Sequence, residues 1–145
     1  MEKLAVPTCE LCESPGGDVL WQSALVRVVA VEDADYPGFC RVILNRHVAE
    51  MTDLPESEQH ALMRTVFAVE AALRALLHPD KVNLASLGNV VPHLHWHVIP
   101  RFRDDRHFPA PVWAPAARSE APARSIDRGR LRAALAACLG APSPR

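Results

Sequence analysis

The pattern of apolar and polar positions along the chain predicts strands gathered around one long helix. Residues 23–33 (SALVRVVAVED) and 39–45 (FCRVILN) are apolar and rich in β-branched side chains, a composition typical of strands. The turn-forming residues DYPG, 35–38, lie between the two segments. We therefore predict two adjacent antiparallel strands.

After these strands, apolar residues recur with the spacing of a helix. Pro55 suits the first turn of a helix, and the apolar residues that come after it recur at positions 62, 66, 69, 73 and 76. Steps of three and four place these side chains on one face, which predicts an amphipathic helix of about six turns. The helix should end at HPD, 78–80, because the residue before a proline avoids the helical region.

The second half of the chain predicts two more strands and a short helix. Residues 81–87 (KVNLASL) and 89–102 (NVVPHLHWHVIPRF) are joined by turn residues at Gly88 and Asn89, which favours a hairpin with the second strand inside the sheet. Residues 103–124 are rich in proline and alanine and predict extended chain, and 125–139 predicts a last helix. Strands followed by a helix and further strands indicate an α+β fold.

The expected architecture is an antiparallel sheet of about five strands with one long helix and a short C-terminal helix. At 145 residues the chain has the size of a single domain, 1–145, with a proline-rich extension and the short helix at 103–145.

Charge and hydropathy exclude several partners. Sixteen basic and seventeen acidic residues give a formal charge of -1, so no broad positive field is available for a polynucleotide. No apolar run reaches the roughly 20 residues that span a bilayer, and the N-terminal residues lack the apolar stretch of a secretory signal. We therefore expect a cytoplasmic protein without a membrane partner.

The four cysteines fall into two kinds. Cys9 and Cys12 form a C-x-x-C, whereas Cys40 and Cys138 stand singly among apolar neighbours and are predicted to be buried. The C-x-x-C favours a metal or redox motif, and the redox interpretation is the weaker one because no βαβ pattern follows it.

Three of the seven histidines, His93, His95 and His97, stand at every second position of one predicted strand. Alternate residues of a strand share a face, so the three imidazoles should point one way and Trp96 should point into the core. All three could not be protonated in a tight site, which leaves at least one neutral. Two chemistries fit: zinc ligation with an open position for water, or covalent attack by an imidazole on phosphorus. The alternative is three histidines on a solvated face.

The segment HLHWHVI, followed by Pro100 and Arg101, resembles the motif of the histidine triad (HIT) superfamily of nucleotide hydrolases and transferases. Residues 28–54 also resemble that family's strand, Pro-Gly turn, second strand and following histidine, and together the resemblance covers about 9–105. It implies a homodimer that binds a nucleotide substrate against the triad strand. His95 would attack the α-phosphorus to form a nucleotidyl-histidine, and His97 would stabilise charge on the phosphoryl group.

The resemblance also supplies partners for the C-x-x-C. In some HIT proteins and related hexose-phosphate uridylyltransferases, equivalent residues bind zinc, and here they are Cys9, Cys12, His47 and His93. Two thiolates and two imidazoles form a closed tetrahedral set, so this zinc would be structural. The alternative is a pair of reduced thiols without metal.

The sequence departs from the family just before the triad. Asn89 replaces the usual glutamine, and Val90 replaces a serine or threonine hydroxyl that contacts the leaving group. Valine can donate no hydrogen bond, so leaving groups of low pKa, such as nucleotides or pyrophosphate-linked moieties, become the better candidates.

Further candidates follow from the same resemblance. Glu32 or Asp33 would contact the ribose, Asn83 would lie near the phosphate, and Arg101 would meet distal phosphates. Trp113 is a candidate for contact with a base or a dimer partner. His60, His78 and His107 match no motif position and are expected at the surface.

The sequence therefore predicts a HIT-family enzyme that hydrolyses or transfers nucleoside 5′-phosphoryl groups, most simply a phosphoric anhydride hydrolase. Two alternatives stay open at this point. One is a metal-dependent hydrolase with the triad as ligands, and the other is a nucleotide-binding module without turnover.

Overall fold

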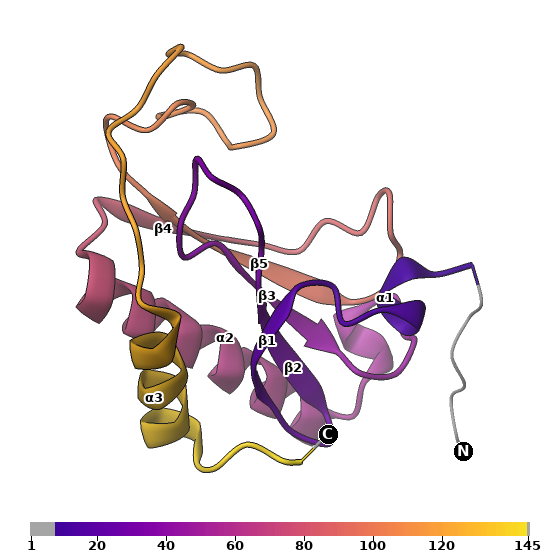
Figure 1. Ribbon diagram of the computed structural model, residues 1–145. Helices are drawn as coiled ribbons and strands as arrows, with labels where there is room; N and C mark the ends of the chain where they lie inside the picture. Colours follow the sequence, from indigo (N-terminus) through magenta and orange to yellow (C-terminus); the bar gives the residue numbers. More distant parts are fainter. Residues whose placement is uncertain (1–7, 145) are drawn as a thin grey trace.

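A computed structural model describes residues 8–144 and contains one antiparallel sheet of five strands in the order β1-β2-β3-β5-β4 (Figure 1). The strands are β1 (Asp18–Gln22), β2 (Val26–Ala30), β3 (Cys40–Leu44), β4 (Lys81–Ala85) and β5 (His95–Arg101). β5 lies between β3 and β4 and pairs with both, so the histidine strand is an inner strand as predicted.

Two helices, α2 (Glu56–Leu77) and α3 (Arg128–Leu139), cover one face of the sheet (Figure 1). The apolar faces of both helices are buried in one cluster with the inward residues of the strands. The buried helical residues are Leu62, Val66, Val69 and Leu73 of α2 and Leu131 and Leu135 of α3. Leu94, Trp96 and Val98 join that cluster, as their alternation with the histidines predicts. The side chains of His95 and His97 lie on the opposite face of the sheet.

The boundaries of the helices follow from local chemistry. Pro55 is the N-cap of α2, and the helix ends where His78 adopts the left-handed conformation with φ of 49° and donates its N–H to Arg74 O. α3 begins three residues later than predicted, at Arg128, because the side chain of Asp127 caps it by accepting from the Arg130 N–H. No helix within 8–144 is both long and apolar enough to cross a membrane.

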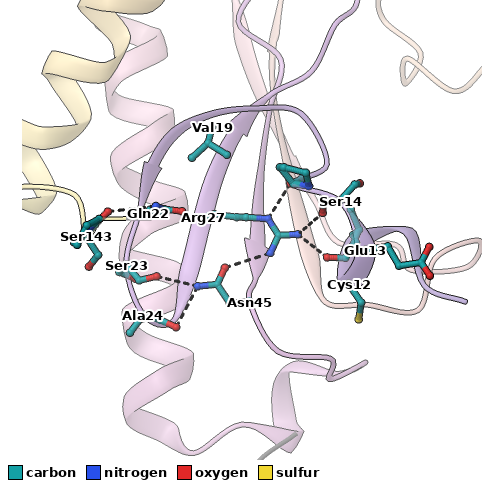
Figure 2. A pocket seen from close by; sticks show the side chains of 13 residues that line it. Cys12, Glu13, Ser14, Val19, Gln22, Ser23, Ala24, Arg27, Asn45 and Ser143 are labelled. Carbon is teal, nitrogen blue, oxygen red and sulfur yellow. Dashed lines mark hydrogen bonds between the residues drawn. The ribbon is translucent and has the colours of Figure 1, made fainter. Parts of the chain in front are cut away.

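The N-terminal segment lies on the histidine face. Cys9 is the N-cap of α1 (Glu10–Glu13), and Cys12 lies within that helix. Cys9 and Leu11 pack on Val29 and Ile43, which point away from α2. Arg27 of β2 holds this segment in place by donating to Leu11 O at 2.6 Å and to Pro15 O at 2.8 Å. Figure 2 shows the Arg27 guanidinium reaching the segment beside Ser14, whose backbone oxygen also accepts from it. Sequence reasoning gave Arg27 no role, because the carbonyl groups that it binds are identified only by the fold.

Residues 102–127, between β5 and α3, contain no helix or strand and are anchored by a buried polar network. Arg101, 2% exposed, donates to both oxygens of Asp105, at 2.8 and 3.0 Å, and also to Asn83 Oδ1 and Ala110 O. Burial by itself would raise the pKa of Asp105, but the hydrogen bonds from Arg101 and from three backbone N–H groups outweigh burial and hold it well below its ordinary range. Burial also raises the pKa of Tyr36, which donates to Asp105, to about 12.

Two expectations about single residues are wrong. Cys138 is exposed on α3, whereas Cys40 is buried as predicted and burial raises its pKa to about 12. His107 is half-buried, and its Nδ1 lies 2.5 Å from the Tyr36 hydroxyl, so it belongs to the polar network and not to the solvated surface.

Candidate active site and metal centre

His95 and His97 lie side by side on the face of the sheet opposite α2. Their rings are 4.9 Å apart and nearly perpendicular, and the two residues are 8% and 6% exposed. Across the β3–β5 ladder His95 pairs with Ile43 and His97 pairs with Arg41. The inner position of β5 therefore holds both imidazoles on rigid backbone while one edge of each stays accessible.

The hydrogen bonding of His95 selects one tautomer. Its Nδ1 lies 2.5 Å from the backbone oxygen of His93, and a carbonyl oxygen can only accept, so Nδ1 carries the proton. Nε2 then keeps its lone pair. This is the arrangement that a nucleophilic imidazole requires, because attack uses one nitrogen while the other stays protonated and fixed.

His97 is held neutral by its surroundings. It contacts Phe39 and Trp113 edge to face, at ring distances of 5.8 and 5.0 Å. Burial, with smaller contributions from His95 and the guanidinium of Arg41, lowers the pKa of His97 to about 4. Its Nδ1 is buried and has no hydrogen-bond partner within the described part of the chain. A neutral imidazole still carries one N–H, which can be donated to a phosphoryl oxygen.

Lowering the pH from 7 to 4 is expected to destabilise the wild-type protein relative to a His97→Gln variant. The unfolded imidazole binds a proton near pH 6.5 and folded His97 only near pH 4, so the unfolded state binds more protons between these values. The difference in free energy of unfolding between the two proteins should grow to about 3 kcal/mol by pH 4 and level off below about pH 3. Urea denaturation of both proteins across this range measures it, and a difference that does not change with pH would contradict the prediction.

The two histidines open into a groove of about 390 Å³, which we call the triad groove. The turn between β4 and β5 forms one wall and supplies Asn89 and Val90, the latter 93% exposed. The other lining residues are Glu10, Leu11, Arg41, Leu87, Gly88, Val91 and Trp113. A groove of this size with two imidazoles at its floor can hold a phosphoryl group and part of a leaving group.

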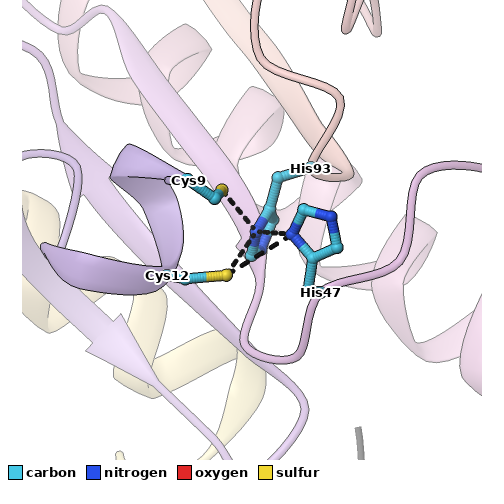
Figure 3. Close-up of side chains that lie close together, drawn as sticks. All are labelled: Cys9, Cys12, His47 and His93. Carbon is cyan, nitrogen blue, oxygen red and sulfur yellow. Dashed lines mark hydrogen bonds between the residues drawn. The ribbon is translucent and has the colours of Figure 1, made fainter. Parts of the chain in front are cut away.

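The first histidine of the motif, His93, belongs to a different cluster. His93 precedes β5, and its Nε2 lies 2.6 Å from Leu44 O, which turns Nδ1 toward the C-x-x-C (Figure 3). Nδ1 of His93 is 3.4 Å from the sulfur of Cys9, 3.5 Å from that of Cys12 and 3.3 Å from Nδ1 of His47. The structure therefore brings together the four predicted metal ligands, Cys9, Cys12, His47 and His93.

The three distances from His93 Nδ1 fit a tetrahedral zinc ion, and all four ligand atoms lie within 4.8 Å of one another. With Zn–N of about 2.0–2.1 Å and Zn–S of about 2.3 Å, ligand atoms lie roughly 3.3–3.8 Å from one another. The hydrogen bond from His93 Nε2 to Leu44 O is the kind of outer contact that fixes the tautomer of a metal-binding histidine. Burial lowers the pKa of His93, with smaller contributions that include His47, and so favours the neutral form that binds metal. Because His93 faces the thiols, the triad does not present three imidazoles to one ion.

Two of the predicted nucleotide-binding residues, Arg101 and Asn83, interact with each other. Among the described residues, the guanidinium of Arg101 donates to Asp105, Asn83 Oδ1 and Ala110 O and lies over the rings of Tyr36 and Phe108, so its donors serve the polar network. Neither residue is among those that line the triad groove in the described part of the chain. Of the predicted nucleotide ligands, Asn89 lies in the groove wall.

The two acidic candidates for the ribose, Glu32 and Asp33, make contacts within the protein. Glu32 forms an ion pair with Arg128 of α3 at 2.7 Å, which directs its side chain toward the helical face and away from the histidines. Asp33 Oδ1 accepts the N–H of Asp35 and stabilises the turn before Pro37 and Gly38. Arg41 was missed by sequence reasoning, because its place beside His97 depends on the pairing of β3 with β5.

Comparison with known proteins agrees with this geometry. A family model described as HIT domain matches residues 15–104, more than half of the chain. The chain belongs to the histidine triad (HIT) family. No curated protein matches it.

Solved structures of the family cover nearly the whole chain. A histidine triad protein from Bradyrhizobium japonicum is 30% identical, with a TM-score of 0.70 over 95% of this chain and 99% of that one. A histidine triad protein from Marinobacter aquaeolei is 25% identical, with a TM-score of 0.72 over 92% and 98%. A Zn-bound histidine triad family protein from Mycobacterium smegmatis is 24% identical, with a TM-score of 0.62 over 90% and 94%, which shows the shared fold.

Proposed function

We propose that the chain is a nucleotide hydrolase or nucleotidyl transferase that attacks the α-phosphorus of nucleoside polyphosphates or nucleotide conjugates through His95. The observation that carries the proposal is the hydrogen bond of His95 Nδ1 to His93 O, which leaves Nε2 with its lone pair beside a neutral His97. Phosphoric anhydrides are the preferred substrates, because Val90 has no side-chain donor for a poor leaving group.

The reaction proceeds in two displacements. The Nε2 lone pair of His95 forms a bond to phosphorus, the bond from phosphorus to the bridging oxygen breaks, and the leaving group departs with that electron pair. Nδ1 keeps its proton on His93 O, so the phosphorus-bound imidazole is cationic and remains a good leaving group. Water or another acceptor then attacks phosphorus, loses a proton to solvent, and returns His95 to its neutral form. His97 donates its N–H to a phosphoryl oxygen as charge develops there.

Intact-protein mass after a brief acid quench tests this proposal. The protein is mixed with dinucleoside polyphosphates and nucleotide conjugates, and wild type is compared with His95→Ala. A nucleotidyl adduct on wild type alone supports covalent catalysis and identifies the nucleotide from its mass. Absence of both adduct and product favours a binding module without turnover, and product without an adduct favours direct attack by water.

We also propose a structural zinc ion bound by Cys9, Cys12, His47 and His93. The ligand distances support it, and the Zn-bound structural relative from Mycobacterium smegmatis is consistent with it. The ion would tie α1 to the residue that begins the triad, and His93 O in turn holds His95. The metal would therefore position the nucleophile without touching the substrate.

We further propose a homodimer that forms along β4 and α2. Among residues 8–144, β4 pairs only with β5, so its outer edge is an open strand edge. Phe67 of α2 is 53% exposed and lies one turn before Glu70, which contacts the same hollow as Lys81 and Val82 of β4. An open edge beside an exposed aromatic ring suits a second copy of the chain.

Light scattering coupled to size exclusion is expected to give twice the chain mass of 15.9 kDa for the wild-type protein. Phe67→Asp should shift the protein toward the monomer, because it would place a charge in the apolar part of the interface. Circular dichroism checks that the variant is folded. A monomeric wild type at micromolar concentration would contradict the dimer.

A further inference from the structure

We propose that Arg41 forms an anion-binding subsite of the triad groove and binds a phosphate of the group that leaves. The inference rests on the proposed function and narrows its substrate class to anhydrides whose leaving group is itself a phosphate. Four features of Arg41 support it: its place in the sheet, its unused donors, its uncompensated charge and the chemistry of the neighbouring turn.

The sheet places Arg41 directly beside His97. The two residues are partners in the β3–β5 ladder, so their side chains leave the same face of adjacent strands. Both line the triad groove together with His95. A phosphoryl group bound by the histidines would therefore have the guanidinium of Arg41 on its β3 side.

Most of the donors of Arg41 have no hydrogen-bond partner among residues 8–144. A guanidinium carries five N–H donors, and in this structure Nη1 donates to Gly16 O at 3.2 Å. Nε is buried without a hydrogen-bond partner in the described part of the chain. A buried donor without a partner is costly, so an anionic ligand that reaches it gains binding energy.

The charge of Arg41 is also not compensated. Within 8–144 no ion pair joins Arg41 to an acidic side chain, and its hydrogen bond is to a backbone oxygen. By contrast, Arg101 and Arg128 pair with carboxylates at 2.8 and 2.7 Å, and Arg27 donates to a carbonyl oxygen at 2.8 Å. Of the acidic residues that the structure describes, Glu10 alone lines the groove, and it is exposed. A guanidinium without a carboxylate partner, beside two imidazoles that can donate N–H groups, makes this side of the groove attractive to phosphate.

The guanidinium of Arg41 would stabilise the charge that develops on the leaving group. When the bond to the bridging oxygen breaks, negative charge develops on the departing phosphate. Val90 can offer it no hydrogen bond, and a fixed cation in the groove stabilises it instead. A leaving group that carries no phosphate would gain less from Arg41.

The test compares two substrates that deliver the same adenylyl group, diadenosine tetraphosphate and the p-nitrophenyl ester of AMP. Arg41→Met should lower the ratio of kcat/KM for the anhydride to kcat/KM for the ester by roughly 100-fold, the loss typical of one oxyanion donor. Arg130→Met, which removes an exposed arginine of α3, is the matched control and should leave the ratio as in wild type. Arg41→Lys should restore part of the ratio, because it restores the charge without the planar donor set.

A ratio that does not change in Arg41→Met would overturn the inference, since a residue that only anchors Gly16 would lower both activities together. Binding of inorganic tripolyphosphate, measured by calorimetry, gives a readout that does not depend on turnover. We expect at least about 10-fold weaker binding in Arg41→Met than in wild type, and equal affinities would overturn the subsite. If wild type turns over neither substrate, the proposed function fails, and the calorimetric comparison alone decides the role of Arg41.

Discussion

Replacement of His95 by alanine is expected to lower kcat/KM for nucleotide anhydrides by at least about 10³-fold, because the variant lacks the atom that forms the covalent bond to phosphorus. The measurement is steady-state release of nucleoside monophosphate, together with the adduct mass. The fold should persist, because His95 Nδ1 makes one local hydrogen bond to His93 O and the ring faces the groove rather than the main core.

The matched control for this substitution is His60→Ala. His60 lies on the outer face of α2, and its side chain is 74% exposed, so its loss should leave kcat/KM within experimental error of wild type. If His95→Ala retained more than a few per cent of wild-type activity, a nucleophilic His95 would be excluded. The next candidate would then be water attack assisted by His97.

Removal of the proposed zinc is expected to produce the largest loss of stability. Cys9→Ser should lower the zinc content from one ion per chain toward zero and the free energy of unfolding by on the order of 4 kcal/mol or more. The physical reason is that four ligands from three distant segments, 9–12, 47 and 93, are held together by one ion. Elemental analysis and urea denaturation with and without a chelator measure both effects.

Cys138→Ser is the control for the zinc prediction, because Cys138 is an exposed thiol of α3 far from the cluster in sequence and on the other side of the sheet. It should leave zinc content and stability close to wild type. A purified wild type without zinc, together with equal stability of Cys9→Ser and Cys138→Ser, would instead indicate two reduced thiols.

Much of the fold could be predicted from local patterns. The 3–4 spacing of Leu62, Val66, Val69 and Leu73 located α2, because an apolar stripe at that spacing has one stable way to be buried. The strands β2 and β3 followed from β-branched runs on either side of a turn. β1 was not located, because its five residues, DVLWQ, are too short to show a clear alternation, and its register shifts between Val19 and Trp21.

For the candidate site, too, some features follow from local sequence patterns and others depend on long-range contacts. The sequence by itself determined that His95 and His97 share a face of one strand and that Cys9 and Cys12 are close together, because strand alternation and the C-x-x-C spacing are local properties of the backbone. Only the tertiary structure decided that His93 turns to the thiols, that Arg101 is buried in an ion pair with Asp105 and that Glu32 points to α3. The same holds for Arg41, which the register of β3 on β5 sets beside His97. These outcomes depend on contacts between residues far apart in the chain, and a local pattern carries no information about which distant segment lies across the ladder.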